Sequence, residues 1–204
     1  MKKLMIAACA VALAGAVQAA TYNWSANSNG AVYNGYDAPT KGTIWQGATT
    51  ISDAQWYLIY ANANTGLSQA DAITALREGT SISDYVLASG TTGSDGKIAK
   101  TTFSTDSEKF ALDGANKMSA YFIVLNDAGD SVYVSAASTV EADLSGGEKN
   151  YNIATATSKF LRDDDGTVNF SGTNYGWYST VPEPTSGLLL LLGVAGLALK
   201  RRRA

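Results

Sequence analysis

The residue types that most enzymes use for catalysis are scarce in this chain of 204 residues. It contains no histidine and a single cysteine, Cys9, which excludes Ser-His-Asp and Cys-His catalysis and the usual zinc ligand sets. Carboxylate catalysis of the glycosidase kind stays open, since it needs two acidic side chains that face each other across a cleft. No pair of acids stands out in that role. We therefore expect a protein that is not an enzyme and that binds no cofactor.

The densest acidic segment is a run of three aspartates followed by Gly166, and it contains Asp163 and Asp165. Carboxylate oxygens followed by a glycine can wrap a calcium ion. Adjacent acids, however, point in different directions along an extended chain, and the alternating acids of an EF-hand loop are missing. A solvated turn is the favoured interpretation. Asp163 and Asp165 remain the candidate metal ligands if a metal binds.

Aromatic side chains with turn residues between them fill the segment 21–47, where Trp24 and Trp45 are the largest. Spaced aromatic rings can stack on sugar rings, which makes Trp24 and Trp45 the candidate ligand-binding residues. The alternative is that these rings cover the open end of a small β core, and their irregular spacing favours it. We expect irregular strands and turns at the domain edge here.

The distribution of charge argues against nucleic acid as a partner. Six of the fifteen lysines and arginines lie at the two ends of the chain, which leaves nine basic against seventeen acidic residues between positions 20 and 180. An acidic body of this kind repels a phosphate backbone.

The N-terminus has the three parts of a secretory signal peptide. Lys2 and Lys3 precede an apolar run over residues 4–17, and Val17-Gln18-Ala19 places small residues where signal peptidase needs them. We expect cleavage after Ala19, with an uncleaved N-terminal anchor as the alternative. Cys9 would leave with the signal, so the mature chain could form no disulfide.

The middle of the chain predicts a mainly β domain over residues 20–180. The apolar run 55–61 is typical of a strand buried on both faces at the centre of a sheet. Ser68 can cap a helix over 68–78 that Gly79 ends, with residues 67, 72, 73 and 76 toward the core. Further strands are expected over 84–89, 97–103, 119–125, 131–136, 151–157 and 173–180, and the pair 121–125 and 131–135 forms a hairpin. We predict an antiparallel sandwich or barrel-like fold with one short helix.

The C-terminal tail, residues 181–204, has three parts in order. Pro182, Glu183 and Pro184 are followed by an apolar run over 187–199 and by the basic cluster Lys200, Arg201, Arg202 and Arg203. The apolar run forms a helix of roughly 20 Å, somewhat short of a hydrocarbon core of ~30 Å. The basic cluster next to this span stays on the cytoplasmic side, so the body faces outward.

In these residues the tail resembles the PEP-CTERM family of sorting signals. The resemblance implies recognition of Pro182, Glu183 and Pro184 by an exosortase, a membrane-embedded cysteine transpeptidase that removes the tail and passes the body to the surface or the exopolysaccharide matrix. The expected partners are signal peptidase, exosortase and, transiently, the inner membrane. An ordinary tail anchor with permanent membrane residence is the alternative.

For the body we expect a structural or interaction role at the cell surface or in the extracellular matrix. A carbohydrate-binding module for the exopolysaccharide matrix is the second interpretation. A carboxylate-dependent enzyme that acts on glycans is the third.

Overall fold

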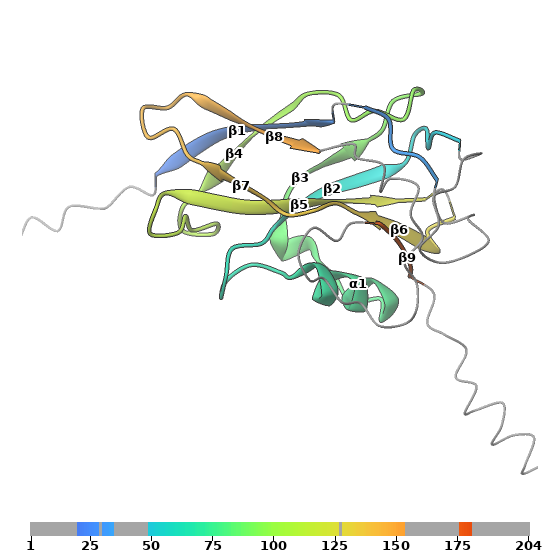
Figure 1. The fold of residues 1–204 in the computed structure, drawn as a ribbon. Helices are drawn as coiled ribbons and strands as arrows, with labels where there is room; N and C mark the ends of the chain where they lie inside the picture. The colour runs from blue at the N-terminus through green and yellow to red at the C-terminus, as the bar shows by residue number, and fades with distance from the viewer. Residues whose placement is uncertain (1–19, 29, 35–48, 127, 154–175, 181–204) are drawn as a thin grey trace, which may run out of the picture.

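The computed structural model describes residues 20–28, 30–34, 49–126, 128–153 and 176–180. Within these ranges the chain forms nine strands, one α-helix and one turn of 3₁₀-helix (Figure 1). Their bounds are β1 (Thr21–Ser28), β2 (Gln55–Tyr60), α1 (Gln69–Arg77), η1 (Ser83–Tyr85), β3 (Val86–Thr91), β4 (Thr101–Asp106), β5 (Lys117–Leu125), β6 (Ser131–Val134), β7 (Ser138–Glu141), β8 (Glu148–Ile153) and β9 (Gly176–Ser179).

The larger sheet has the strand order β3-β2-β5-β6-β9, and every described pair in it is antiparallel. The long strand β5 pairs with β2 along one edge, and along its other edge it pairs first with β7 and then with β6. Ser135 lies between β6 and β7 and keeps contact with β5, since its backbone N–H donates to the Phe122 carbonyl over 2.9 Å. β6 and β7 therefore act as one interrupted partner of β5.

The smaller sheet has the order β4-β1-β8. β4 runs antiparallel to β1, whereas β8 runs parallel to it. The mainly β fold with two facing sheets and one helix is confirmed, but the expectation of an antiparallel arrangement throughout is wrong for this pair. The parallel pair is possible because residues 29–147 connect the two strands, far more chain than a crossover needs.

The two sheets enclose an aromatic core. Trp24 from the smaller sheet packs against Tyr151 with a ring centroid separation of 5.5 Å. From the larger sheet, Trp56 packs on Phe122 at 6.0 Å. All four side chains are at most 3% exposed. Because Trp and Tyr rings each bury a large area, a few of them can fill the space between two short sheets.

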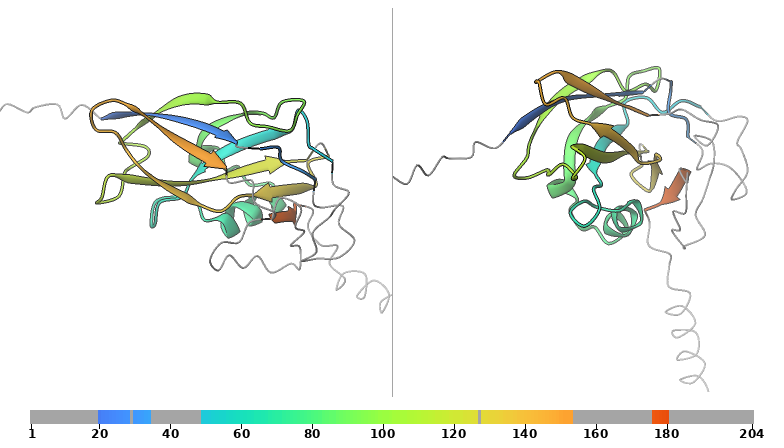
Figure 2. Two further views of the ribbon diagram at one scale, coloured as in Figure 1. Left: turned by 45° about the horizontal axis from the view of Figure 1, so that its top comes forward. Right: turned by 60° about the vertical axis from the view of Figure 1, so that its left-hand side comes forward.

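The opposite face of the larger sheet is covered by α1, so the molecule has three layers, as the two views of Figure 2 show. Ile73 and Ala72 of the helix are buried against Ile59, Tyr121 and other side chains of the sheet. The helix begins as predicted, because the Ser68 hydroxyl accepts the Asp71 backbone N–H. Gly79, with φ of 68°, follows its end.

The hairpin predicted over 121–125 and 131–135 is confirmed, with Val124 opposite Tyr133. Gly129, with φ of 69°, lies in its loop. The strand predicted within 173–180 is also present as β9, at the edge of the larger sheet. The central position predicted for 55–61 is confirmed, because β2 lies between β3 and β5.

Several strand predictions are wrong in position. The segment after residue 20 is not irregular, since β1 is an eight-residue strand at the centre of the smaller sheet. The strand predicted over 97–103 begins instead at Thr101. β3 begins two residues later than predicted, β6 ends at Val134, β8 begins at Glu148, and β7 was not predicted. These segments are short or polar, so the register with distant partners decides where pairing starts.

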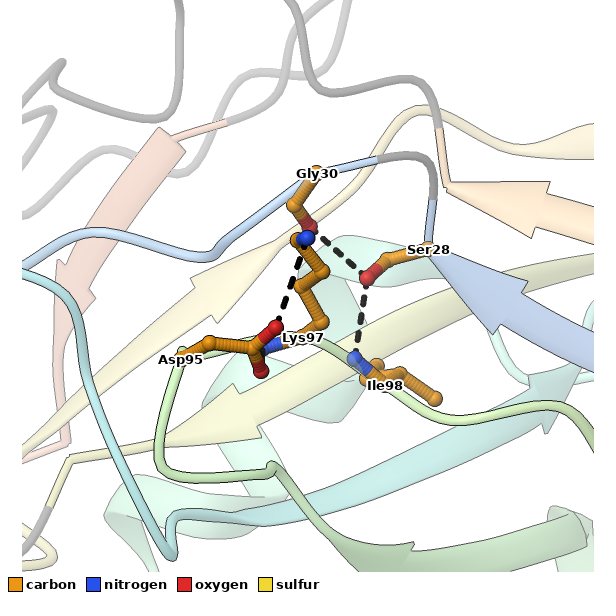
Figure 3. Close-up of polar contacts among 5 residues, drawn as sticks. All are labelled: Ser28, Gly30, Asp95, Lys97 and Ile98. Carbon is orange, nitrogen blue, oxygen red and sulfur yellow. Dashed lines mark hydrogen bonds and ion pairs between the residues drawn. The ribbon is translucent and has the colours of Figure 1, made fainter.

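The residues before β4 form a turn that fastens the end of β1 (Figure 3). The Ser28 hydroxyl donates to the Gly30 carbonyl over 2.7 Å and accepts the Ile98 N–H over 2.9 Å. In the same turn the Lys97 ammonium lies 3.3 Å from the Asp95 carboxylate. The Lys97 backbone N–H donates to that carboxylate as well, and this bond holds the Asp95 pKa below its usual range.

No helix among the described residues is long and apolar enough to cross a membrane. The predicted signal peptide 1–19 and the predicted hydrophobic helix 187–199 lie outside those residues.

Candidate functional site

The outer face of the smaller sheet carries an unusual set of side chains. Side chains alternate along each strand, so Trp24 and Ala26 of β1 point into the core while Asn23, Ser25 and Asn27 lie on the opposite face of the sheet, where neighbouring side chains cover Ser25 completely. The neighbouring strands add short polar residues to the same face: Thr102, Ser104, Glu148 and Asn150. We call these seven outward residues the polar face. Most of them are amides or hydroxyls, whereas a typical solvated surface is rich in Lys and Glu.

The side chains of the polar face are joined across the strands by hydrogen bonds. Ser104, which lies opposite Asn23 in the register, donates its hydroxyl to the Asn23 side-chain oxygen over 3.0 Å. Ser25 donates to the Asn150 oxygen over 3.1 Å, and the Asn150 amide donates to Asn27 over 2.8 Å. The Asn23 amide donates to the Gly146 carbonyl. These bonds restrict the rotamers of the amides before any ligand arrives.

Glu148 is the charged member of the polar face. Its carboxylate lies 2.6 Å from the Lys100 ammonium. The hydrogen bond from Lys100 is the main cause that lowers the Glu148 pKa below its ordinary value. Glu148 therefore carries a negative charge at neutral pH that the lysine offsets. The face as a whole combines near neutrality with many donors and acceptors.

A shallow open cleft of about 370 Å³ lies over part of this face. Its lining is formed by Asn23, Trp24, Thr102, Phe103, Ser104, Gly146 and Glu148. The turn between β7 and β8, which contributes Gly146 to the lining, also contains Leu144, which is 64% exposed and is the one large apolar side chain at that exposure in the described part of the chain. The volume suits one small polar unit, and the adjoining row of amides extends the contact along the strands.

This arrangement suits the binding of a ligand through hydrogen bonds rather than the catalysis of a reaction. Amides and hydroxyls provide paired donors and acceptors that match the vicinal hydroxyl groups of a neutral sugar. Glu148 is the sole acid lining the cleft, so the two facing carboxylates of a glycosidase are not formed by its lining residues. Within the described ranges, no three acidic side chains lie close enough to share a metal ion.

The candidate ligand residue Trp24 lies directly beneath the polar face and points the other way. Its side chain is 0% exposed, and its indole N–H donates to the Thr105 hydroxyl over 2.8 Å. A ring held in this way cannot stack on a sugar, so the core interpretation of Trp24 is the one that the geometry supports. The other candidates, Trp45, Asp163 and Asp165, lie outside the described residues.

Sequence reasoning missed the polar face although a pattern for it was present. Asn23, Ser25 and Asn27 alternate with Trp24 and Ala26, which is the period of a strand with one buried face. The frequency of Asn and Ser in turns hid this alternation.

A second groove, of about 480 Å³, lies on the other side of the molecule between the end of α1 and the larger sheet. Its lining is more apolar, with Leu76 from the helix and Tyr57, Val86 and Leu125 from the strands. Thr80–Ser83 close one side of it. Its polar groups are the hydroxyls of Tyr57, Thr80, Ser81 and Ser83, without an amide or a charged side chain in the lining, so we place the candidate site on the polar face.

The tail of the chain matches a known sorting signal. The family model of the PEP-CTERM protein-sorting motif matches residues 180–203. The resemblance that Pro182, Glu183 and Pro184 predicted is thereby confirmed, and the motif identifies an exported protein with exosortase as its processing partner. The match covers the tail alone. No curated protein sequence matches the chain.

Proposed function

We propose that this protein is an exported, exosortase-processed component of the cell surface or extracellular matrix with a structural or interaction role. The observation that carries the proposal is the sorting motif at residues 180–203, directly behind a folded β domain. The β domain is then the part that is delivered, and the tail is its sorting signal. The basic cluster Lys200–Arg203 sets the topology, and membrane attachment lasts until the tail is removed.

The contacts of Ala20, at the N-terminal end of the domain, are compatible with signal-peptide cleavage after Ala19. Ala20, the residue after the predicted cleavage at Ala19, donates its N–H to the Ser107 hydroxyl over 3.0 Å. The Ala20 carbonyl accepts the Ser107 N–H over 3.1 Å. Cleavage after Ala19 would make Ala20 the new N-terminus and would leave every strand of the described domain intact.

The mass of the protein recovered from the cell surface tests the proposal. We expect a mass that lacks residues 1–19 and the cluster Arg201–Arg203, as intact-protein mass spectrometry would show. A surface-located chain that keeps these arginines would contradict processing and would support permanent anchoring. Replacement of Pro182 and Pro184 by alanine is the matched variant, in which the tail should be retained.

Carbohydrate binding is the second candidate function, and the polar cleft favours it. A neutral extracellular polysaccharide offers hydroxyl groups in pairs, and the rigid amides Asn23 and Asn150 can receive them. Pull-down of the body with polysaccharide should weaken in Asn23→Ala and Asn150→Ala. Asn64→Gly, which removes an amide in the turn after β2 and keeps a residue that tolerates the φ of 69° there, serves as the control. Equal binding by all four proteins would contradict this function.

Catalysis on glycans by carboxylates is the third interpretation, and we do not adopt it. The cleft contributes Glu148 as its one acid, and Lys100 pairs with it. Hydrolysis of a glycan that depended on Glu148 would overturn the non-enzymatic proposal.

A further inference from the structure

The last strand of the body ends in a set of hydrogen bonds from three parts of the chain. The Thr180 backbone N–H donates to the Asp130 carbonyl over 2.9 Å, and its hydroxyl donates to the Gly129 carbonyl over 2.8 Å. Arg77, at the end of α1, donates its Nε–H to the Ser179 carbonyl over 2.7 Å. We call these five residues the β9 latch. Thr180 is 8% exposed, so these hydrogen bonds are largely shielded from solvent.

The latch adjoins the sorting motif in sequence. A single residue, Val181, separates Thr180 from Pro182, and six residues separate Thr180 from Gly187 at the start of the apolar run. Seven steps of fully extended chain span at most about 25 Å. A membrane-embedded enzyme that binds Pro182–Pro184 must therefore work close to the folded domain.

The latch also lies where local opening is easiest. β9 has four residues and pairs with β6 at the edge of the larger sheet. Edge and terminal segments open at a lower free energy than the core. Release of Ser179 and Thr180 breaks the three hydrogen bonds of the latch, while Trp177 and Tyr178 can stay buried in the two cores. Two further residues of extended chain then become available on the N-terminal side of the motif.

We propose that the β9 latch controls the access of the exosortase to the sorting motif, so that processing proceeds from the state in which Ser179 and Thr180 are released. The inference rests on the proposed function, because it concerns the same processing step. Arg77 and Thr180 are positioning residues in this scheme. They touch neither the enzyme nor the cleaved bond and act by holding the segment that precedes the motif.

The test uses the full chain in cells that contain the exosortase and follows loss of the tail by pulse-chase labelling and mass spectrometry. Thr180→Val removes the hydroxyl bond at nearly constant volume. Since one hydrogen bond shifts such an equilibrium by roughly two- to tenfold, the tail should be lost two to ten times faster. Arg77→Met should accelerate the loss similarly, and Thr180→Ser should restore the wild-type rate.

A control and a linker separate access from general loss of stability. Thr139→Val, on β7, removes an exposed hydrogen bond between the hydroxyls of Thr139 and Ser119 of β5 and should leave the rate unchanged. A flexible Gly-Ser linker of six residues inserted between Thr180 and Val181 should raise the rate and abolish the effect of Thr180→Val, since the motif then reaches the enzyme without release of the latch.

Two results would overturn the latch: equal processing of wild type and Thr180→Val, or an effect of Thr180→Val that persists behind the linker. A wild-type chain that keeps its tail would instead refute the proposed function, and the latch with it. The two failures are thus distinguishable.

Discussion

Replacement of Trp24 tests whether this residue belongs to the core or to a ligand site. In the structure the indole is fully buried, contacts Tyr151 at 5.5 Å and donates to the Thr105 hydroxyl over 2.8 Å. Trp24→Ala deletes the whole ring from between the sheets. Core truncations of this size cost about 3–5 kcal/mol of the free energy of unfolding.

Trp24→Phe separates the hydrogen bond from the packing. Phenylalanine keeps an aromatic ring but leaves the Thr105 hydroxyl, which is 2% exposed, without its donor. An unsatisfied buried polar group costs about 1–3 kcal/mol, to which the smaller ring adds a packing loss. We expect a total of about 2–4 kcal/mol. Asn23→Ala, one residue away on the polar face, should cost less than about 1 kcal/mol because its side chain is exposed.

Equilibrium unfolding of the body in urea, followed by far-ultraviolet circular dichroism, measures these differences through the transition midpoint. The expected order of destabilisation is Trp24→Ala, then Trp24→Phe, then Asn23→Ala. The reasoning would be refuted if Trp24→Ala left the midpoint close to that of the wild type while it abolished polysaccharide binding. Trp24 would then contact the ligand.

Three further predictions concern stability. Gly96 has φ of 72°, and an added Cβ would lie 3.0 Å from the Val32 carbonyl oxygen. At Gly129, with φ of 69°, an added Cβ meets nothing within 4 Å. In urea unfolding, Gly96→Ala should therefore lower the free energy of unfolding by more than the roughly 1–2 kcal/mol of strain expected for Gly129→Ala. Burial raises the pKa of Tyr121 and of Tyr151 well above the usual 10.0. The contribution of the neutral hydroxyls to the free energy of unfolding is therefore complete below pH 10 and falls above it by about 1.4 kcal/mol per pH unit for each tyrosine. Tyr151→Phe should make the decline of the thermal midpoint at alkaline pH shallower. The lowered pKa of Glu148 makes stability depend on pH in the opposite direction: its contribution to the free energy of unfolding is present above the ordinary pKa of 4.5 and is lost as the pH falls through the pKa of the folded state. Glu148→Gln should remove that part of the stability loss at acid pH. An unchanged loss of stability at acid pH would contradict the Lys100 contact.

Local sequence signals were sufficient for the helix and for one hairpin. Ser68 and Gly79 mark the two ends of α1 within the segment itself, and the loop with Gly129 joins strands that are neighbours in the chain. Such elements depend on contacts between residues that are close in sequence, so capping and turn chemistry identify them.

The smaller sheet could not be predicted in the same way. β1 and β8 pair in parallel over a separation of 125 residues, with Ser25 beside Asn150. Neither strand has the apolar run that identified β2, because one face of each is polar. The pairing depends on Trp24 and Tyr151 meeting in the core, which is a contact that no local pattern specifies. The polar face follows from this pairing and was missed with it.

The β9 latch and the polar face lie on different parts of the domain, which bears on whether removal of the tail and ligand binding can take place independently. β9 and α1 lie on the side of the molecule opposite the smaller sheet (Figure 1), and Arg77 joins the end of the helix to Ser179. The segment that leads to the sorting motif thus starts from an edge strand of the larger sheet, whereas Asn23 and Asn150 lie on the outer face of the smaller sheet. A ligand bound to the polar face would therefore leave the processing end of the domain free, and the polar face can be occupied before the tail is removed.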